Sequence, residues 1–133
     1  MKYVKSLVCA LTLSAALIGA ATTAQAGPRE DIIASFGAGP GNAAMGKIMF
    51  ETNYGTGKPS TPRCATCHTS SPLQMGQTRT GKAIQPMAVS RTPDRFTDAA
   101  KVAKWFKRNC SSVIGRLCTP QEKVDYITYM VSQ

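Results

Sequence analysis

Cys64-Ala65-Thr66-Cys67-His68 is the stretch of sequence that decides the fold, because it has the C-x-x-C-H spacing of covalent c-type haem attachment. Two thiols on one short helical turn can each form a thioether with a haem vinyl group, and the next residue is then held under the iron. His68 is the only histidine of the chain, and it occupies that position. The sequence therefore predicts one covalent haem c, bound through Cys64 and Cys67 with His68 as the proximal iron ligand.

Three other interpretations of this motif are weaker. A C-x-x-C redox pair is expected in a thioredoxin-like strand–helix context, which the sequence lacks. A zinc site would need a fourth ligand and would have to accept Cys67 and His68 as consecutive ligands, whereas zinc motifs space their ligands further apart. A structural disulfide would explain the two cysteines in isolation, but the single histidine, an export signal and a loop-rich helical pattern together favour haem.

Residues 1–26 have the pattern of a secretory signal peptide. Lys2 and Lys5 precede an apolar run from Leu7 to Ala21, and Ala24-Gln25-Ala26 supplies a cleavage pattern before Gly27. The alternative, a retained membrane anchor, is disfavoured because the run is short and rich in Ala, Ser and Thr. We expect the cytochrome c domain to be residues 27–133, exported to the periplasm and not membrane-spanning once the signal is removed.

Composition sets the limits of size and charge. The 133 residues, with 43% hydrophobic and 7% aromatic residues, suit one small globular domain rather than a membrane bundle. The formal charge of +9 becomes +7 without residues 1–26, since 14 basic and 7 acidic side chains remain. Export keeps such a chain away from chromosomal DNA. The charge therefore indicates a docking surface for an acidic protein partner, or no more than a solvated surface, rather than nucleic-acid binding.

Two helices are predicted on the basis of their caps and apolar spacing in the middle of the chain. The first runs over residues 43–52, after a Gly-Ala-Gly-Pro-Gly break, with Asn42 as its cap. The second runs over residues 98–110 with Thr97 as its cap. Their expected apolar positions are Met45, Ile48, Met49 and Phe50 in the first helix, and Val102, Trp105 and Phe106 in the second.

The last helix has the clearest start signal. Thr119-Pro120-Gln121-Glu122 combines an N-cap, a first-turn proline and a capping-box glutamate. Its expected buried stripe is Val124, Ile127, Met130 and Val131. Because no strand pattern of comparable quality occurs, the prediction is an all-α, class I cytochrome c-like fold, a small helical domain wrapped around one covalent haem.

Cys110 and Cys118 are the cysteines left over once Cys9 leaves with the signal and haem takes the other two. In an oxidising compartment they are expected to pair as a disulfide. Closing this short loop would contribute roughly 2–3 kcal/mol on the chain-entropy model. The disulfide would also fix the end of the helix that contains Asn109.

The ligand on the other side of the iron has two candidates. A conventional electron-transfer cytochrome uses methionine there, and Met87 is the only suitable one after His68, since Met75 is too near and Met130 belongs to the last helix. Asn109 is the rival, because it continues the apolar stripe of its helix, where an unpaired amide would cost roughly 1–3 kcal/mol. It could also end the helix by bonding to its own backbone. Periodicity leaves these alternatives open.

From about Gly46 to Tyr129 the sequence resembles the family of the Sphaeroides haem protein (SHP), unusual class I-type c-type cytochromes. The most specific segments are Lys104 to Cys110 and Cys118 to Lys123. The other matching residues are Gly46 and Phe50, the C-x-x-C-H motif, Gly81-Lys82, Pro86-Met87-Ala88 and Arg95-Phe96-Thr97-Asp98.

The resemblance implies specific roles. Asn109, immediately before the first disulfide cysteine, would bind the ferric iron and leave it on reduction, so that the ferrous haem could bind oxygen, nitric oxide or carbon monoxide. The neighbouring disulfide would be Cys110–Cys118, and electrons would come from a dihaem cytochrome c or a similar donor. Met87 would then pack in the core or a loop.

Three hypotheses follow. The leading one is a periplasmic haem protein with His68 and Asn109 as ligands, and the alternative is a His/Met electron carrier that uses Met87. Enzymatic reduction of oxygen or nitric oxide at the open iron is the third. No acid–base group is visible near the expected distal side, so we do not predict a dedicated enzyme and name no catalytic residue.

Overall fold

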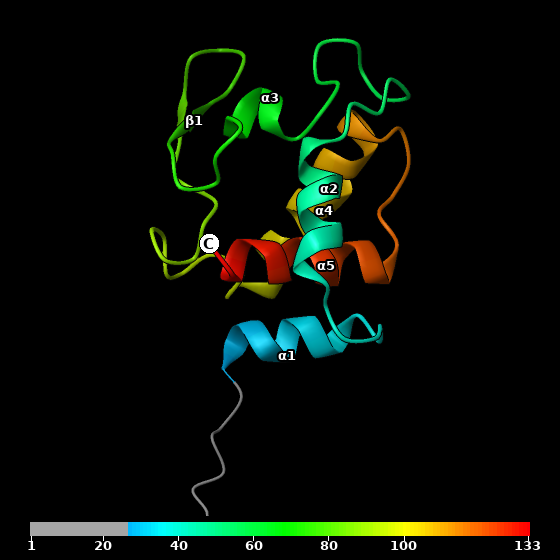
Figure 1. Ribbon diagram of the computed structural model, residues 1–133, viewed down its shortest axis with the longest axis vertical. Helices are drawn as coiled ribbons and strands as arrows, with labels where there is room; N and C mark the ends of the chain where they lie inside the picture. Colours follow the sequence, from blue (N-terminus) through cyan, green and yellow to red (C-terminus); the bar gives the residue numbers. More distant parts are fainter. Residues whose placement is uncertain (1–26) are drawn as a thin grey trace, which may run out of the picture.

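Helices and one short hairpin, joined by long loops, form residues 27–133, the part of the chain that the computed structural model describes (Figure 1). The predicted secretory signal at residues 1–26 lies outside the described residues. The elements, in chain order, are α1 (Pro28–Ser35), α2 (Ala43–Glu51), α3 (Ala65–His68), β1 (Gly76–Gln77), β2 (Ala83–Ile84), α4 (Ala99–Val113) and α5 (Pro120–Val131). The mostly helical architecture confirms the predicted fold class.

The core forms where α2 crosses α5 (Figure 1). Asn42 caps α2 as predicted, and its side chain accepts hydrogen bonds from the backbone N–H groups of Ala44 and Met45. Gly46 lets the two helices approach closely, because a Cβ there would overlap the backbone carbonyl of Asp125 on α5. Phe50 is fully buried and packs against the rings of Tyr126 and Tyr129.

The predicted apolar face of α2 is only half right. Met49 and Phe50 are buried, but Met45 and Ile48 are 51% and 57% exposed. The reason is the crossing at Gly46, which turns the side of the helix formed by residues 46, 49 and 50 towards α5 and leaves the neighbouring side in solvent.

α5 begins as predicted. Thr119 caps it, the Thr119–Glu122 capping box is complete, and Pro120 stands in the first turn. Val124, Ile127 and Met130 are buried, whereas Val131 is 46% exposed at the helix end, contrary to the prediction. The buried carboxylate of Asp125 accepts a hydrogen bond from the backbone N–H of Asn42, which ties the start of α2 to α5.

α4 begins and ends one to three residues later than predicted. Asp98 is the N-cap and accepts from the Lys101 N–H, while the Thr97 hydroxyl donates instead to the Asp94 carbonyl. The helix continues past Cys110 to Val113, and the chain turns at Gly115 with a φ of +79°. Val102 is buried and Trp105 is 47% exposed, and both line the large cavity described below together with Phe106, so the predicted stripe faces that space.

The sequence pattern did not predict the hairpin. β1 and β2 pair antiparallel, with Gly76 opposite Ile84 and Gln77 opposite Ala83. Strands of two residues have no periodicity to detect. Within residues 27–133, none of the helices is both long and apolar enough to cross a membrane.

Candidate haem-binding site

The C-x-x-C-H motif forms one short helical turn. Cys64 precedes α3, and its carbonyl accepts hydrogen bonds from the N–H groups of both Cys67 and His68 at 3.3 Å. Cys64 and Cys67 are half-buried free thiols, whereas Cys110 and Cys118 are joined. The backbone turns sharply after His68, because Thr69 has a φ of +60°, in the left-handed region that non-glycine residues rarely adopt.

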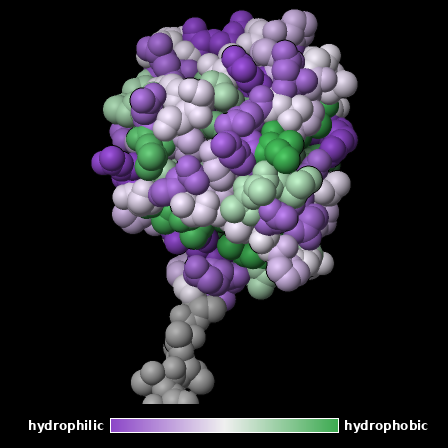
Figure 2. All heavy atoms as spheres, in the orientation of Figure 1, coloured by the Kyte–Doolittle hydropathy of each residue, from purple (hydrophilic) through white to green (hydrophobic). Residues whose placement is uncertain are grey.

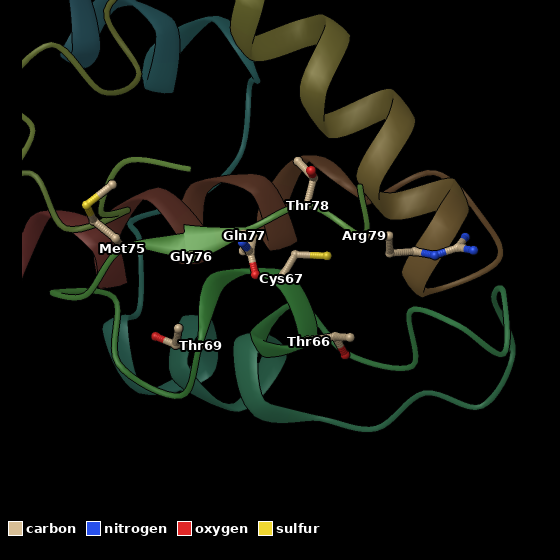
Figure 3. Close-up of a pocket in the computed structure, with 8 residues that line it drawn as sticks. All are labelled: Thr66, Cys67, Thr69, Met75, Gly76, Gln77, Thr78 and Arg79. Carbon is tan, nitrogen blue, oxygen red and sulfur yellow. The ribbon is translucent and has the colours of Figure 1, made fainter. Parts of the chain in front are cut away.

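The hairpin lies directly on this turn. A Cβ at Gly76 would overlap the carbonyl oxygen of Cys67, so β1 can approach α3 only because position 76 is glycine. A pocket of about 410 Å³ lies between them, and Figure 3 labels the residues that line it. In this view the side chains of Cys67 and Arg79 point in the same direction, away from Met75.

Cys67 and Arg79 also line a second, much larger cavity of about 1480 Å³. It is bounded by α3, the hairpin, the segment 85–98 and α4. The structure brings together on its wall all the predicted site residues except Cys118: Cys64, Cys67, His68, Met87, Asn109 and Cys110. Residues separated by more than forty positions in the sequence therefore surround one space.

Both apolar and charged side chains line this cavity. Apolar lining comes from every side, from Met49, Ile84, Met87, Val102, Trp105, Phe106, Ile114 and Tyr126. Basic residues outnumber acidic ones among the lining residues: Lys58, Arg63, Arg79, Lys82, Arg95, Lys101, Lys104, Lys107 and Arg108 against Asp94 and Asp98. Such a space suits a large, flat, apolar group that bears negative charge at its edge.

His68 is held as a neutral imidazole. Burial is the main cause that lowers its pKa to about 4, and the positive charge of Arg95 adds to the effect. Its Nδ1 is buried and has no hydrogen-bond partner among the described residues. A neutral ring that lines the cavity and has an unsatisfied nitrogen fits an iron ligand.

Burial also raises the pKa of the Cys64 thiol to about 11, and the charge of Cys67 adds to the rise. Cys64 is therefore a protonated, largely buried thiol at neutral pH. Residues 27–133 contain no group of three or more His, Cys, Asp or Glu side chains placed to hold a metal ion. The zinc interpretation of the motif thus lacks a set of ligands.

Asn109 and Met87 both line the cavity but differ in their surroundings. Met87 is 8% exposed and belongs to the hydrophobic core, packed with Met49 and Tyr126 among others. Asn109 is exposed, because the core side of α4 is formed by Val102, Cys110 and Val113. Together with Val102, Trp105 and Phe106 it lines the cavity, so the residues of the predicted stripe of this helix all border the same space.

The disulfide Cys110–Cys118 is present as predicted, with a Cα–Cα distance of 5.6 Å. The loop before α3 reinforces this end of α4: the Thr56 hydroxyl donates to the Ile114 carbonyl at 2.6 Å, and the Lys58 N–H donates to the Ser112 carbonyl at 2.7 Å. Both cysteines are buried. The backbone next to Asn109 is therefore fixed although its side chain is exposed.

Sequence reasoning gave no site role to Arg95 or Tyr126, which also line the cavity. Tyr126 is buried among Phe50, Phe96 and Phe106, with ring centroids 5.7–6.3 Å away. Burial raises its pKa well above the usual value. One signal in the sequence could have pointed to Arg95: the segment Arg95–Asp98 is among the residues that match the SHP family.

Comparisons with known proteins are consistent with this site. Residues 37–130 match the family described as a domain of unknown function, DUF1924. The chain is 48% identical over 126 residues to the cytochrome c-type protein SHP of Cereibacter sphaeroides, covering 92% of this chain and 97% of that protein. It is also 37% identical over 89 residues to cytochrome c'' of Methylophilus methylotrophus, covering 66% and 62%.

Two solved structures are similar throughout most of their length. Oxidized SHP, described as an oxygen-binding cytochrome c, has a TM-score of 0.74 and 49% identity, with 77% of this chain and 95% of that one covered. Oxidized cytochrome c'' from Methylophilus methylotrophus has a TM-score of 0.67 and 30% identity, with 80% and 94% covered.

Proposed function

The chain belongs to the family of the cytochrome c-type protein SHP, and from this premise we propose that it is an exported monohaem c-type cytochrome whose reduced form binds oxygen or nitric oxide. In the ferric state His68 and Asn109 would be the two axial ligands. The observation that carries the proposal is that Cys64, Cys67, His68 and Asn109 line one cavity, although α4 and the motif are far apart in the sequence.

When bound, haem c supplies a one-electron redox centre and an iron able to take a diatomic ligand. Cys64 and Cys67 would hold it by thioether bonds from one helical turn. His68 is ready to ligate because burial keeps its imidazole neutral at physiological pH. The apolar lining, including Met49, Val102 and Trp105, would exclude water from the group.

Asn109 would act as the labile ligand. An amide oxygen is a hard, weak donor that suits ferric iron better than ferrous iron. Its side chain is exposed and makes no hydrogen bond with residues 27–133, while the buried, disulfide-bonded Cys110 next to it fixes the backbone. Because the backbone is fixed, the amide would leave the iron on reduction by rotation of its side chain, without movement of the helix.

One observation favours a second candidate function, a conventional electron carrier with Met87 on the iron. Met87 lines the same cavity as His68. Its core packing supports the contrary view that it fills space beside the group. A Met87→Ala variant with unchanged ferric and ferrous spectra would exclude the second candidate.

The basic residues of α4 suggest where an electron donor docks. Lys101, Lys104, Lys107 and Arg108 all line the cavity mouth beside Asn109. Lys104 and Arg108 also flank Trp105, at 5.6 and 5.5 Å from its ring centroid. The proposed partner is therefore a dihaem cytochrome c or a similar donor with an acidic face.

The deciding experiment compares the spectra of the purified holoprotein in both redox states. Reduction with dithionite should give a ferrous spectrum that changes when carbon monoxide is added. The Asn109→Ala variant should lose the six-coordinate low-spin ferric spectrum and keep the carbon monoxide response. A wild-type ferrous haem that stays six-coordinate and insensitive to carbon monoxide would contradict the proposal.

A further inference from the structure

Arg95 is a cation fixed in the wall of the large cavity by backbone groups on two sides. Its Nε donates to the Pro86 carbonyl at 3.0 Å, and its Nη2 donates to the Gln85 carbonyl. From the other side, the Nε of Arg29 on α1 donates to the Arg95 carbonyl at 2.9 Å, and Arg29 Nη2 donates to the Pro93 carbonyl. Thus α1 and the segment 85–86 together set the position of this guanidinium.

The backbone at this point is strained as well as anchored. Phe96, directly after Arg95, has a φ of +62°, in the left-handed region that non-glycine residues rarely adopt. Its ring packs edge-on against Tyr126 at 6.2 Å, which holds the unusual conformation in place. Strain of this kind persists only where the surroundings determine the conformation, so Arg95 is held rather than mobile.

The charge of Arg95 is not neutralised by a described carboxylate. Among residues 27–133 the ion pairs are Lys101–Asp98 and Arg116–Glu122. Nη1 of Arg95 donates to none of these residues, and the side chain is half-buried. The site therefore contains a fixed cation with an unused donor group, on the wall of the same cavity that His68 lines.

We propose that Arg95 is a positioning residue for the haem, pairing with a propionate carboxylate and favouring the ferrous state, with Arg29 holding it in place. The inference rests on the proposed function only in that a haem occupies the cavity. A planar guanidinium suits a carboxylate, and haem brings two of them. A fixed positive charge disfavours the extra positive charge of ferric iron, so its removal should lower the reduction potential.

The test measures the reduction potential of the holoprotein by spectroelectrochemistry. Arg95→Gln should shift the midpoint to lower potential, with at least a tenfold rise in the ferric-to-ferrous ratio at fixed potential, which is about 59 mV for one electron. Arg95→Lys keeps the positive charge but loses the planar guanidinium that can donate two parallel hydrogen bonds. It should therefore shift the midpoint potential by less than Arg95→Gln does. Arg29→Gln should shift the midpoint in the same direction by less than Arg95→Gln.

Arg79→Gln is the matched control, because Arg79 lines the same cavity but lies exposed in the hairpin turn. Its effect should vanish at high salt, whereas the effect of Arg95→Gln should persist. Should Arg95→Gln fail to incorporate haem, Arg95→Lys and Arg29→Gln still give the answer. Midpoints equal to that of Arg79→Gln in every folded variant would overturn the inference.

The carbon monoxide response of the same samples separates the two proposals. An unchanged midpoint with an intact ferrous carbon monoxide complex overturns the role of Arg95 alone. A lowered midpoint in a protein whose ferrous haem ignores carbon monoxide supports Arg95 and overturns the proposed gas binding.

Discussion

Asn109 combines a fixed backbone with an unconstrained side chain. Cys110 anchors the helix through its disulfide, whereas the amide of residue 109 is exposed on the cavity wall. Met87 has the opposite character, since its thioether is enclosed by core residues. At the scale of single residues, the two side chains considered as iron ligands therefore differ in how tightly their surroundings hold them.

Replacing Asn109 by methionine should close the ferrous site. A thioether binds ferrous iron well, so Asn109→Met should give a six-coordinate low-spin ferrous spectrum and at least a tenfold weaker carbon monoxide affinity. The measurement is a carbon monoxide titration of the reduced holoprotein, with Met87→Ala as the control that should leave affinity unchanged. Wild-type affinity in Asn109→Met would argue against residue 109 as the ligand.

At the scale of elements, the crossing of α2 and α5 positions the cavity floor. Met49 lines the cavity from α2 and Tyr126 lines it from α5, so the distance between these helices sets the space between the two side chains. Gly46 sets that distance, because its missing Cβ is what admits the Asp125 carbonyl.

Gly46→Ala should therefore destabilise the protein although alanine is the better helix former. Overpacking of this contact should lower the free energy of unfolding by about 1–3 kcal/mol, measured by denaturant titration of the holoprotein. Met45→Ala, one residue away and 51% exposed in the wild type, should change it by less than about 0.5 kcal/mol. Equal stability of the two variants would contradict the close crossing.

The start of α5 should respond to acid through Glu122. Its pKa is lowered from 4.5 to about 2, chiefly by hydrogen bonds from Arg116, with the Thr119 N–H of the capping box also contributing. A carboxyl whose folded pKa lies below its unfolded pKa stabilises the fold above about pH 4.5 and loses that contribution as the pH falls towards 2.

Glu122→Gln keeps the capping-box geometry but removes the charge. Because the pair with Arg116 is partly exposed, we expect a loss of about 1 kcal/mol at pH 7. The difference from wild type should shrink as the pH falls from 4.5 to 2, measured by thermal unfolding at several pH values. A difference that stays constant down to pH 2 would exclude a role for the charge.

At the scale of the whole molecule, positive charge gathers around the cavity. Basic side chains line its rim from the loop before α3, the hairpin and α4. The face drawn in Figure 2 is mostly hydrophilic, with separate apolar patches rather than one continuous one. The excess of basic over acidic side chains on the cavity wall makes electrostatic attraction the proposed means of bringing an electron donor there.

Electron transfer from an acidic donor cytochrome should slow as ionic strength rises. Stopped-flow reduction should give a second-order rate constant that falls at least tenfold between low and high salt. Lys104→Gln should weaken the salt dependence, whereas Lys47→Gln, which removes an exposed charge of α2 that does not line the cavity, should not. A rate independent of salt would contradict docking on α4.

Local signals were readable from the sequence, and packing was not. The capping box of Thr119 and Glu122 is complete within four residues, so its prediction was confirmed. Asp98 and Thr97 are adjacent capping residues, and periodicity could not choose between them. The exposure of Met45 and Ile48 depends on how the whole of α2 is turned against α5, which no short window of sequence contains.

The same contrast between local signals, which the sequence contains, and packing, which it does not, holds for the candidate site. C-x-x-C-H named three residues directly, and the remaining pair of cysteines was the disulfide expected from the count. Arg95 could not be assigned from spacing, because its role depends on carbonyls of residues 85 and 86 and on an arginine 66 positions away.

The disulfide also has a consequence for how the protein is assembled. Four cysteines can form three different sets of two bridges, but bonding of Cys110 to Cys118 removes two of these sets and leaves Cys64 and Cys67 only each other. That remaining pair sits on the turn where cofactor attachment would take place. Early closure of the C-terminal loop would thus protect the chain against mispaired, dead-end isomers during maturation and reserve two thiols for the final covalent step.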